Sequence, residues 1–393
     1  MNPSGIQRVA ILRHGYYPGD PRVYKEAHAL QEAGYEVEVI CLRNRDEKPE
    51  EMLDGIRVFR LGLSHRRGSK LRYMLEYGGS ILLMALKLSW RHLKKAYDLV
   101  QVNTLPDELV FATLLPRLLG ARILLDMHEP TPELYLTKYG SRASSRAFAF
   151  HARMEQLAIR YAYRVLTVND ALKDRYVGRG APGSKITVVR NVPAEEVFIP
   201  SAGVAFPSGV FCVVTHGTLQ PRYGHEVLLR AVPLLRDVIP GFRLLIVGDG
   251  ETAPVLKQLA QDLKCADVVE FAGSVPLPQV PGRLALAQVG VVPLMPSPFS
   301  DLCQPNKLFE YVALGIPVVA ARFPAMREGF DGESFLQFTP GDPAELAGAI
   351  GDVYRNPEPA RRRARKALEQ YEALRWSAGK QVYLDAVKGC LNG

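Results

Sequence analysis

Short apolar runs alternate along this chain with longer segments whose apolar residues recur at every third or fourth position. The run 8–15 predicts a buried strand, 21–34 predicts a helix that ends at Gly34, and 35–42 predicts the next strand. Because strand, helix and strand in this order form the unit of a parallel sheet, the pattern predicts an α/β class of fold.

The alternation of strands and helices is interrupted once and then begins again. Residues 199–209 are rich in proline, serine and glycine, which is typical of a linker, and 210–217 starts a second series. We therefore predict an α/β fold of two doubly wound, Rossmann-like domains, one over 1–199 and one over 209–371. Ligands of such sheets bind at the carboxyl ends of the strands, so we expect the site in the cleft where the two domains face each other.

The composition fits a folded protein of two domains. The chain has 393 residues, of which 47% are hydrophobic and 23% are charged, and its net charge of +8 permits an anionic partner. The five cysteines are far apart, with no CxxC pair, which favours reduced thiols. The N-terminus shows no signal-peptide pattern and no apolar run approaches the ~20 residues of a membrane span, so we expect a cytoplasmic protein.

The stretch QPNKLFE in the second half combines the start of a helix with a cation and an acid. Unpaired amides at a helix start, here those of Asn306, Lys307 and Leu308, could bind a diphosphate together with the lysine ammonium. Glu310 lies one turn further, where a carboxylate could accept two ribose hydroxyls. A surface helix with an ordinary lysine–glutamate pair is the alternative.

Two further loops that follow predicted strands carry candidate residues. Gly217 would let the backbone approach a ligand, and Arg222 is the only cation in its loop, although an ordinary turn with a solvated arginine explains the same residues. In the first half, His128 follows a strand and could contact a ligand in the cleft. Because residue 132 is proline, HEPTP is not the HExxH motif of a zinc site, and no metal is expected.

A different site is suggested by the sequence GDGETA at 248–253, which follows a strand and matches the dinucleotide pattern G-x-G-x-x-A. Glu270 follows Gly250 by 20 residues, the spacing of the acid that binds a ribose. That pattern normally follows the first strand of its domain, whereas here the first strand is 210–217. An NAD(P)-dependent enzyme is therefore an alternative interpretation.

The segment 64–95 contains eight lysines and arginines and one acid. Its apolar residues follow one helical face, while Lys87, Arg91 and Lys94 follow another. Such a basic amphipathic helix suits an anionic membrane surface, although a helix packed on the sheet with a solvated basic edge explains the pattern as well. Interleaved aromatic residues for base stacking are absent from it, so no nucleic acid partner is expected.

The ordered set HGTL…RYG, LLIVGDGE, FAGSVP, GVVPL and PNKLFEYVALGIPVVA resembles the retaining glycosyltransferases of family 4, which have the GT-B fold. The first half is similar to the branch that builds exopolysaccharide and cell-surface glycans. The resemblance implies transfer of a sugar from a nucleotide-diphosphate sugar to a hydroxyl acceptor, a glycan or a lipid-linked one. It implies no cofactor besides that co-substrate, no metal, and a peripheral location at the inner face of the membrane.

The resemblance also implies roles for particular residues. Donor contacts fall on Gly217, Thr218, Val275, Asn306, Leu308 and Glu310. Catalytic roles fall on His128, near the transferred sugar, and on Arg222 and Lys307, which would neutralise the leaving diphosphate. The C-terminal helix, 372–393, would cross back to the first domain.

The sequence departs from the family pattern at two positions. The paired acids E-x7-E of the family would place an acid eight residues before Glu310, where this chain has Leu302 with Asp301 beside it. The arginine expected in the first loop of the second domain is replaced by Thr218 or Leu219, which leaves Arg222 as the candidate. A catalytically inactive, membrane-bound scaffold of the same fold is therefore a third interpretation.

Overall fold

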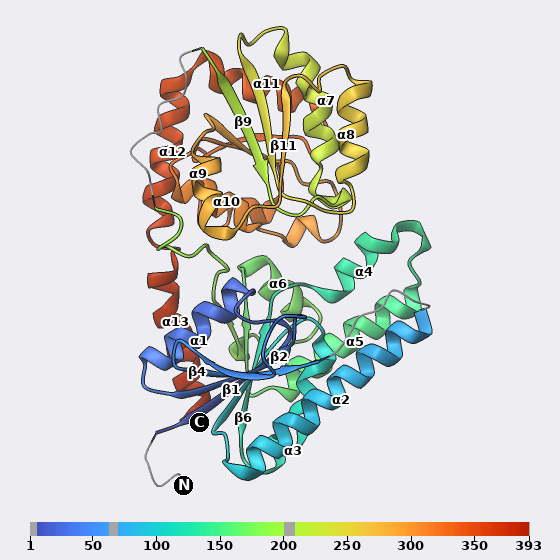
Figure 1. The fold of residues 1–393 in the computed structure, drawn as a ribbon, viewed down its shortest axis with the longest axis vertical. Coiled ribbons are helices and arrows are strands. Elements are labelled where there is room, and N and C mark those ends of the chain that lie inside the picture. Colours follow the sequence, from blue (N-terminus) through green and yellow to red (C-terminus); the bar gives the residue numbers. More distant parts are fainter. Residues whose placement is uncertain (1–5, 63–69, 200–208, 393) are drawn as a thin grey trace. The chain divides into compact units, whose positions relative to one another are not determined.

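The computed structural model describes residues 6–62, 70–199 and 209–392 (Figure 1). The chain divides into two units, 1–191 with 379–393, and 192–378. The boundary after residue 191 precedes the predicted linker, of which residues 200–208 lie outside the described residues.

The first unit is built on a sheet of eight strands in the order β3-β4-β2-β1-β5-β6-β7-β8. All neighbouring strands are parallel except β3 and β4. The strands are β1 (Arg8–Tyr16), β2 (Glu36–Leu42), β3 (Glu50–Leu53), β4 (Ile56–Leu61), β5 (Leu99–Asn103), β6 (Arg122–Met127), β7 (Arg164–Thr167) and β8 (Ile186–Val188). Strands β1, β5 and β6 lie in the middle of the sheet, where β5 and β6 are almost wholly buried and β1 is buried over its first five residues. Because these three strands are parallel, their carboxyl ends lie at one edge of the sheet.

Strands β3 and β4 form an antiparallel hairpin that the strand–helix pattern does not predict. Its turn consists of Asp54 and Gly55, and both residues have positive φ, 47° and 81°. Asp-Gly is a favoured pair for a two-residue hairpin turn because both positions require the left-handed region. The local signal for this hairpin is therefore present in the sequence.

Helices cover the first sheet, and several of them are capped by their own sequence. The helices are α1 (Pro21–Glu32), α2 (Lys70–Lys94), α3 (Leu114–Leu118), α4 (Thr131–Tyr139), α5 (Ser145–Tyr161), α6 (Asp170–Gly178) and α13 (Trp376–Leu391). The Asp20 carboxylate accepts hydrogen bonds from the amides of Arg22 and Val23 and so fixes the start of α1. In the described parts of the chain, no helix has the length and apolar character that a membrane crossing requires.

The apolar periodicity of residues 107–120 predicts a single helix, but the structure has a 3-10 helix, η1 (Asp107–Thr113), followed by the short α3. The Thr113 hydroxyl donates to the carbonyl oxygen of Val110 at 2.6 Å. Pro116 has no amide hydrogen, so an α-helix running through this position would lose one of its hydrogen bonds. Both features favour a break where apolar periodicity alone predicts a continuous helix.

The last helix, α13, belongs for most of its length to the first unit. The Tyr383 hydroxyl donates to Gln101 Oε1 at 2.7 Å, and Gln101 lies in the central strand β5. Tyr383 and Val387 are fully buried. Residues from the far end of the sequence therefore pack against the first sheet.

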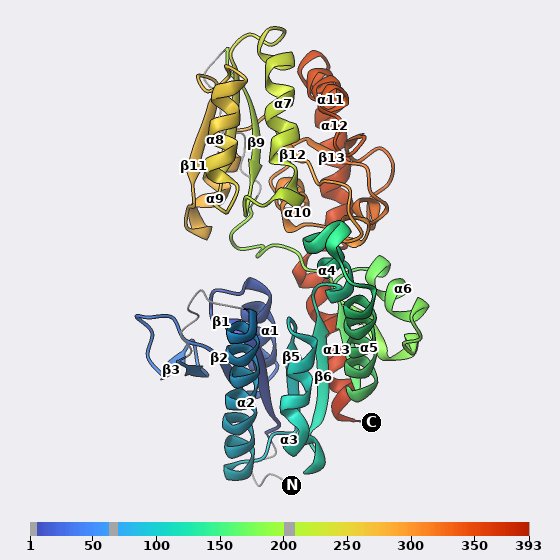
Figure 2. The same cartoon turned by 90° about the vertical axis from the view of Figure 1, so that its right-hand side faces the viewer.

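The second unit contains a six-stranded parallel sheet in the order β11-β10-β9-β12-β13-β14. Figure 2 shows the same elements from the side. The strands are β9 (Phe211–His216), β10 (Phe242–Val247), β11 (Val269–Gly273), β12 (Val289–Val292), β13 (Val318–Ala321) and β14 (Leu336–Phe338). The helices are α7 (His225–Arg236), α8 (Ala253–Asp262), α9 (Val280–Leu284), α10 (Asn306–Ala313), α11 (Pro343–Arg355) and α12 (Pro357–Tyr371). Helices lie on both faces of this sheet, as in a doubly wound fold.

The two glycines of the dinucleotide-like pattern are explained by packing within the second unit. A Cβ atom on Gly248 would lie 2.0 Å from the carbonyl oxygen of Gly217, and one on Gly250 would lie 2.3 Å from that of Leu219. The loop after β10 therefore packs backbone to backbone against the loop after β9. This close approach accounts for both glycines without a bound dinucleotide.

Candidate functional site

Helix α10 begins at the carboxyl edge of the second sheet. Pro305 precedes it in an extended conformation, and no side chain caps its first turn. The amide of Leu308 donates to the carbonyl oxygen of Pro305 at 3.0 Å, so it is already bonded. Of the three amides expected to bind a ligand, those of Asn306 and Lys307 are the ones available at this helix start.

The Lys307 side chain is buried at this helix start, with 7% of the residue exposed. Its ammonium has no hydrogen-bond acceptor among the residues that the structure describes. Burial lowers the pKa of Lys307 to about 8, against the opposing charge of Glu310. A buried ammonium without a partner destabilises the folded state, and a bound anion would offset this destabilisation.

The loop after β9 approaches the same ammonium. A Cβ atom on Gly217 would lie 3.8 Å from Lys307 Nζ, and Gly217 has φ of 103°, which glycine tolerates. Lys307 Nζ lies 5.2 Å from the centroid of the Tyr223 ring, and the Arg222 guanidinium carbon lies 5.0 Å from the same centroid. The structure therefore brings Gly217, Arg222 and Lys307 to one place.

Arg222 stacks on aromatic rings and forms no ion pair with any residue that the structure describes. Its guanidinium lies 5.2 Å from the Phe299 ring centroid, and its Nε is buried without an acceptor in the described part of the chain. Its backbone carbonyl accepts from the amide of Met295 at 2.9 Å, which ties this loop to the loop after β12. A guanidinium that stacks on a ring keeps N–H groups at its edge available to bind an anion.

Glu310 is positioned by a residue that the sequence analysis did not identify. His216, the last residue of β9, forms a short hydrogen bond through Nε2 with Glu310 Oε2. The other ring nitrogen of His216 pairs with the Tyr311 hydroxyl at 2.9 Å. The carboxylate of Glu310 is therefore oriented at the edge of the sheet rather than free on a surface helix.

A second histidine that was not predicted lies beside this site. His225, the first residue of α7, is 2% exposed, and neither ring nitrogen has a hydrogen-bond partner among the described residues. Burial, followed by the charges of Lys307 and His216, holds the pKa of His225 well below its usual range. His225 is therefore a neutral imidazole at neutral pH.

The remaining predicted donor contacts lie on two separate loops. Thr218 is exposed in the loop after β9. Val275 follows β11, the outer strand of the sheet, and packs partly against the core of the second unit. Strand β10 separates β11 from β9, so Val275 lies along the same carboxyl edge at a distance from the Lys307 cluster.

In the first unit, His128 lies at the carboxyl end of β6 and is paired with a buried carboxylate. Its Nε2 is 2.7 Å from Asp126 Oδ2. Arg22 donates to both oxygens of Asp126, at 2.8 and 2.7 Å. Although burial alone would raise it, the charges of Arg22 and then of His128 hold the pKa of Asp126 well below its usual range. The ionised carboxylate therefore accepts from Nε2–H, and Nδ1 is the ring nitrogen of His128 that remains for a ligand.

A buried network extends from this pair to the C-terminal helix. Asn103 donates to Asp126 Oδ2 at 2.8 Å and to Glu26 Oε2 at 2.9 Å, and Gln101 donates to the same Glu26 oxygen at 2.7 Å. Burial, and after it the charge of Asp126, raises the pKa of Glu26 to about 8. Gln101 in turn accepts from Tyr383. The network gives His128 a fixed orientation.

Within the ranges that the structure describes, no group of three or more histidine, cysteine, aspartate or glutamate residues is arranged to hold a metal ion. Leu302, where the family pattern has an acid, is buried.

Two family models match the chain, one in each half. Residues 19–192 match the "Glycosyl transferase 4-like domain" and residues 211–356 match "Glycosyl transferases group 1".

Two curated relatives illustrate the sequence similarity. The glycogen synthase of Mycobacterium tuberculosis is 27% identical over 243 residues, which is 60% of this chain and 57% of that protein. The GDP-mannose-dependent alpha-(1-6)-phosphatidylinositol monomannoside mannosyltransferase of Mycolicibacterium smegmatis is 32% identical over 151 residues, 38% of this chain and 40% of that protein. In these matches the chain spans little more than half of the first relative and less than half of the second.

Solved structures share the fold over nearly the whole chain. A sucrose-phosphate synthase from Thermosynechococcus elongatus has a TM-score of 0.80 at 19% identity, covering 98% of this chain and 99% of that chain. HepE from Anabaena, in complex with UDP-glucose, has a TM-score of 0.73 at 18% identity, covering 97% and 99%. With two α/β units on largely parallel sheets and a glycosyltransferase model matched in each half, the chain belongs to the GT-B glycosyltransferases of family 4.

Proposed function

We propose that this chain transfers a sugar from a nucleotide-diphosphate sugar to a hydroxyl acceptor, with retention of configuration at the transferred carbon. The observation that carries the proposal is the ammonium of Lys307 at the start of α10, which is buried and has no hydrogen-bond acceptor in the part of the chain that the structure describes. A diphosphate is the anion that this place suits, because backbone amides, a second cation and a positive-φ glycine converge there.

The proposed chemistry uses the cluster to stabilise the leaving group. The bond between the sugar carbon and the phosphate oxygen breaks, the acceptor oxygen bonds to that carbon, and the nucleoside diphosphate leaves. The acceptor proton passes to a phosphate oxygen on the same face. Negative charge grows on the diphosphate as the bond breaks, so Arg222 and Lys307 stabilise the transition state more than the bound donor.

In this proposal Glu310 binds the ribose of the donor and His128 binds the sugar that is transferred. Glu310, oriented by His216, accepts the ribose hydroxyls, and backbone groups at Val275 contact the base. His128, fixed by Asp126, accepts a hydroxyl of the transferred sugar through Nδ1. The reaction requires no resident metal and no cofactor besides the co-substrate, because side chains and helix amides neutralise the diphosphate.

The comparisons support the class of donor. One relative is named for dependence on GDP-mannose, and one structural neighbour was solved with UDP-glucose. Both compounds are nucleotide-diphosphate sugars, which share the group that the Lys307 cluster would bind.

The direct test is binding of nucleoside diphosphates by titration calorimetry. UDP, GDP, ADP and dTDP are titrated into the wild type, into Lys307→Met and into Lys257→Met, a control that removes an exposed lysine of the same unit. We expect one of the four to bind the wild type and the control, and to bind Lys307→Met about 100-fold more weakly, the scale of one preorganised contact. No binding to the wild type, or equal binding to all three proteins, would refute the proposal.

We also propose that the acceptor is lipid-linked, in the synthesis of a cell-surface polysaccharide or glycoconjugate, and that α2 docks the enzyme on the inner face of an anionic membrane. Leu82, Leu86, Leu93 and Trp90 of α2 are exposed at 59%, 58%, 67% and 46%. Lys94 Nζ lies 3.7 Å from the Trp90 ring centroid, which joins the cations to this apolar face. An aromatic residue with flanking lysines suits the lipid interface.

The basic face of α2 is smaller than the sequence pattern suggests. Arg91 pairs with the buried Glu38 at 2.5 Å, and Lys95 pairs with Glu36 at 2.5 Å. These two cations therefore hold the helix on the sheet instead of facing a membrane. Residues 64–69 of the predicted segment lie outside the described residues.

A further inference from the structure

The first unit contains a cavity of about 480 Å³ at the amino end of β6, the opposite end of that strand from His128. Four cations and two aromatic rings dominate its lining: Arg117, Arg122, Arg160, Lys185, Tyr161 and Tyr163. No acidic side chain is among the described residues that line it. The cavity is therefore strongly positive and separate from the proposed donor and acceptor residues.

Stacking and backbone contacts hold these cations in place. The guanidinium carbons of Arg117 and Arg122 lie 4.1 Å and 4.5 Å from the ring centroids of Tyr161 and Tyr163. An arginine that stacks on a ring keeps its N–H edges available for an oxygen ligand. Lys185 Nζ donates to the carbonyl oxygens of Arg160 and Ala162 at 3.1 and 2.8 Å, which leaves its third hydrogen for a ligand.

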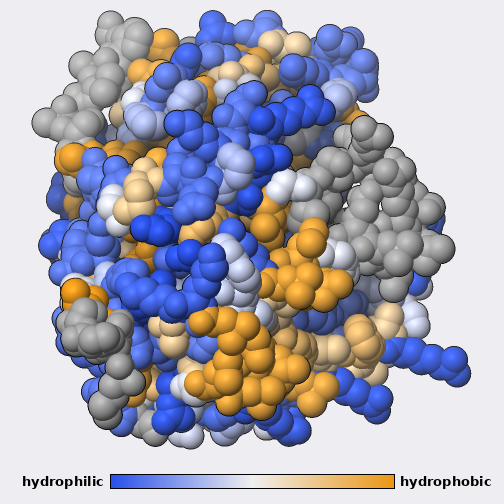
Figure 3. Space-filling view, turned by 60° about the horizontal axis from the view of Figure 1, so that its bottom comes forward, coloured by the Kyte–Doolittle hydropathy of each residue, from blue (hydrophilic) through white to orange (hydrophobic). Residues whose placement is uncertain are grey.

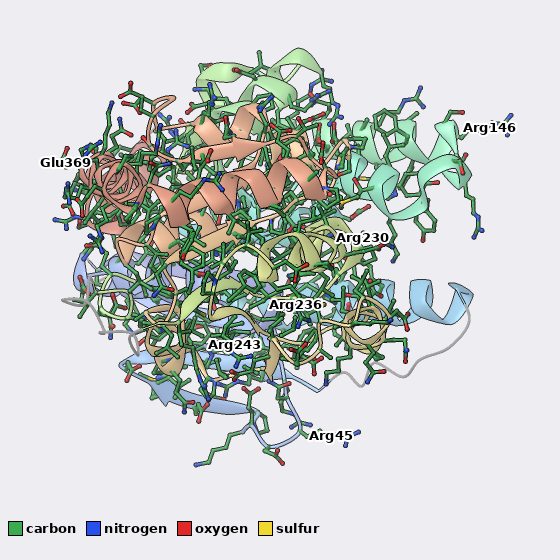
Figure 4. The ribbon with its side chains drawn as sticks, turned by 90° about the horizontal axis from the view of Figure 1, so that it is seen from above. Arg45, Arg146, Arg230, Arg236, Arg243 and Glu369 are labelled. Atoms are coloured by element: carbon green, nitrogen blue, oxygen red, sulfur yellow. The ribbon has the colours of Figure 1, made fainter. Side chains whose placement is uncertain are left out.

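Some arginines at the surface of the second unit have acidic partners. Arg230 pairs with Glu226 at 2.8 Å and Arg236 pairs with Asp267 at 3.0 Å, both on the surface that Figure 4 shows. None of the four cavity cations forms an ion pair within the described ranges of the chain. Burial, and after it the charge of Arg117, lowers the pKa of Lys185, so these two cations repel each other across the cavity. An anion bound between them would relieve this repulsion.

We propose that this cavity binds a phosphate group, carried by an anionic lipid headgroup or by a free phosphate compound. Guanidinium forks match the oxygens of a phosphate and bind it with two parallel hydrogen bonds. Leu114, Leu118 and Leu119, next to Arg117 in the chain, are 53%, 74% and 54% exposed. Figure 3 looks onto this end of the first unit and shows hydrophobic side chains gathered on it. An apolar surface beside a phosphate site suits a headgroup whose acyl chains lie alongside.

The experiment compares two double variants with the same change of charge. Arg117→Gln/Arg160→Gln removes two exposed cavity cations, and Arg362→Gln/Arg365→Gln removes two exposed arginines of α12 as the matched control. Each full-length protein is titrated with inorganic pyrophosphate by calorimetry. Each is also sedimented with phosphatidylcholine vesicles that contain or lack phosphatidylglycerol. The donor site is unaltered in both variants, so it contributes equally to both titrations.

We expect calorimetry to detect one fewer pyrophosphate site in the cavity variant than in the control, or the same number of sites with the affinity of one reduced at least about tenfold. The reason is the loss of charge-assisted hydrogen bonds. Weaker sedimentation with phosphatidylglycerol vesicles, compared with the control, would identify the lipid headgroup as the source. Unchanged sedimentation would identify a free phosphate compound. Equal pyrophosphate binding by both variants would overturn the proposal. Arg122→Gln repeats the test if circular dichroism shows that the double variant is unfolded.

Discussion

Replacing Lys307 by methionine should stabilise the second unit and at the same time remove its affinity for a diphosphate. Burial lowers the pKa of Lys307 from 10.5 to about 8. A pKa difference of about 2.5 corresponds to about 3 kcal/mol, at ~1.4 kcal/mol for each factor of ten. Methionine has a similar length and no charge, so at pH 7 the variant should unfold with a free energy up to about 3 kcal/mol higher than the wild type.

The pH dependence of this difference has a definite sign. Since the pKa of Lys307 is lower in the folded state, the folded protein binds fewer protons than the unfolded chain between about pH 8 and the pKa of a free lysine near 10.5. The stability of the wild type therefore gains from rising pH in this window, and the variant does not. The advantage of Lys307→Met should shrink as the pH is raised from 7 to 10.

The two tryptophans of the chain allow the second unit to be followed by itself. Trp90 lies in the first unit and Trp376 in the second, where it packs against the core. In a Trp90→Phe background, the fluorescence of Trp376 reports chemical unfolding of the second unit. Lys257→Met serves as the control for loss of an exposed lysine.

Adding the nucleoside diphosphate should reverse the order of stability. A ligand at 100 times its dissociation constant stabilises a protein by about 2.7 kcal/mol, and only the proteins that retain Lys307 should gain this. A variant that is less stable than the wild type at pH 7 would refute the reasoning. An advantage that does not change with pH, or an equal gain from the ligand in both proteins, would also refute it.

Four further outcomes are expected. Glu310→Gln should weaken donor binding by roughly 1–2 kcal/mol, because a charge-assisted hydrogen bond becomes a neutral one, and an unchanged calorimetric affinity would contradict the ribose assignment. Burial raises the pKa of Asp107 to about 8, so the folded state loses stability as the pH rises from about 4 to 8. Asp107→Asn should therefore unfold at higher denaturant concentration than the wild type at pH 9 and at a similar one at pH 4; a variant less stable at pH 9 argues against this. Sedimentation with anionic vesicles should fall with added salt, since the screening length shrinks to ~3 Å at 1 M, and should fall further in Lys87→Gln/Lys94→Gln; salt-independent binding would count against docking by α2. Turnover should persist in EDTA, and its loss would show that a divalent ion takes part.

The convergence of Gly217, Arg222 and Lys307 could be predicted from sequence because parallel strands share a carboxyl edge. Each of these residues follows a strand that apolar runs identify, so adjacency in the sheet brings them together. Their sequence spacing alone does not decide between a site and a solvated surface. The burial of Lys307 without a hydrogen-bond acceptor among the described residues favours a site, and burial depends on the packing of residues far apart in the sequence.

The residues that sequence reasoning missed are those whose role depends on a distant neighbour. In the sequence, His216 is only the polar end of a strand, and its role becomes visible once the fold brings Glu310 beside it. In the sequence, Arg91 belongs to a basic helical face, whereas in the structure it pairs with the buried Glu38. By contrast, the Asp54–Gly55 turn carries a local signal that strand–helix periodicity does not use.

The first unit is discontinuous in sequence, and this has a consequence for biosynthesis. The ribosome synthesises residues 192–378 before the part of α13 that belongs to the first unit. Most of the second unit is therefore synthesised while Gln101 still lacks its Tyr383 partner. The His128 network can be completed only after the end of the chain has been made. A chain that ends before residue 379 would keep the complete sequence of the second unit and lack the final helix of the first.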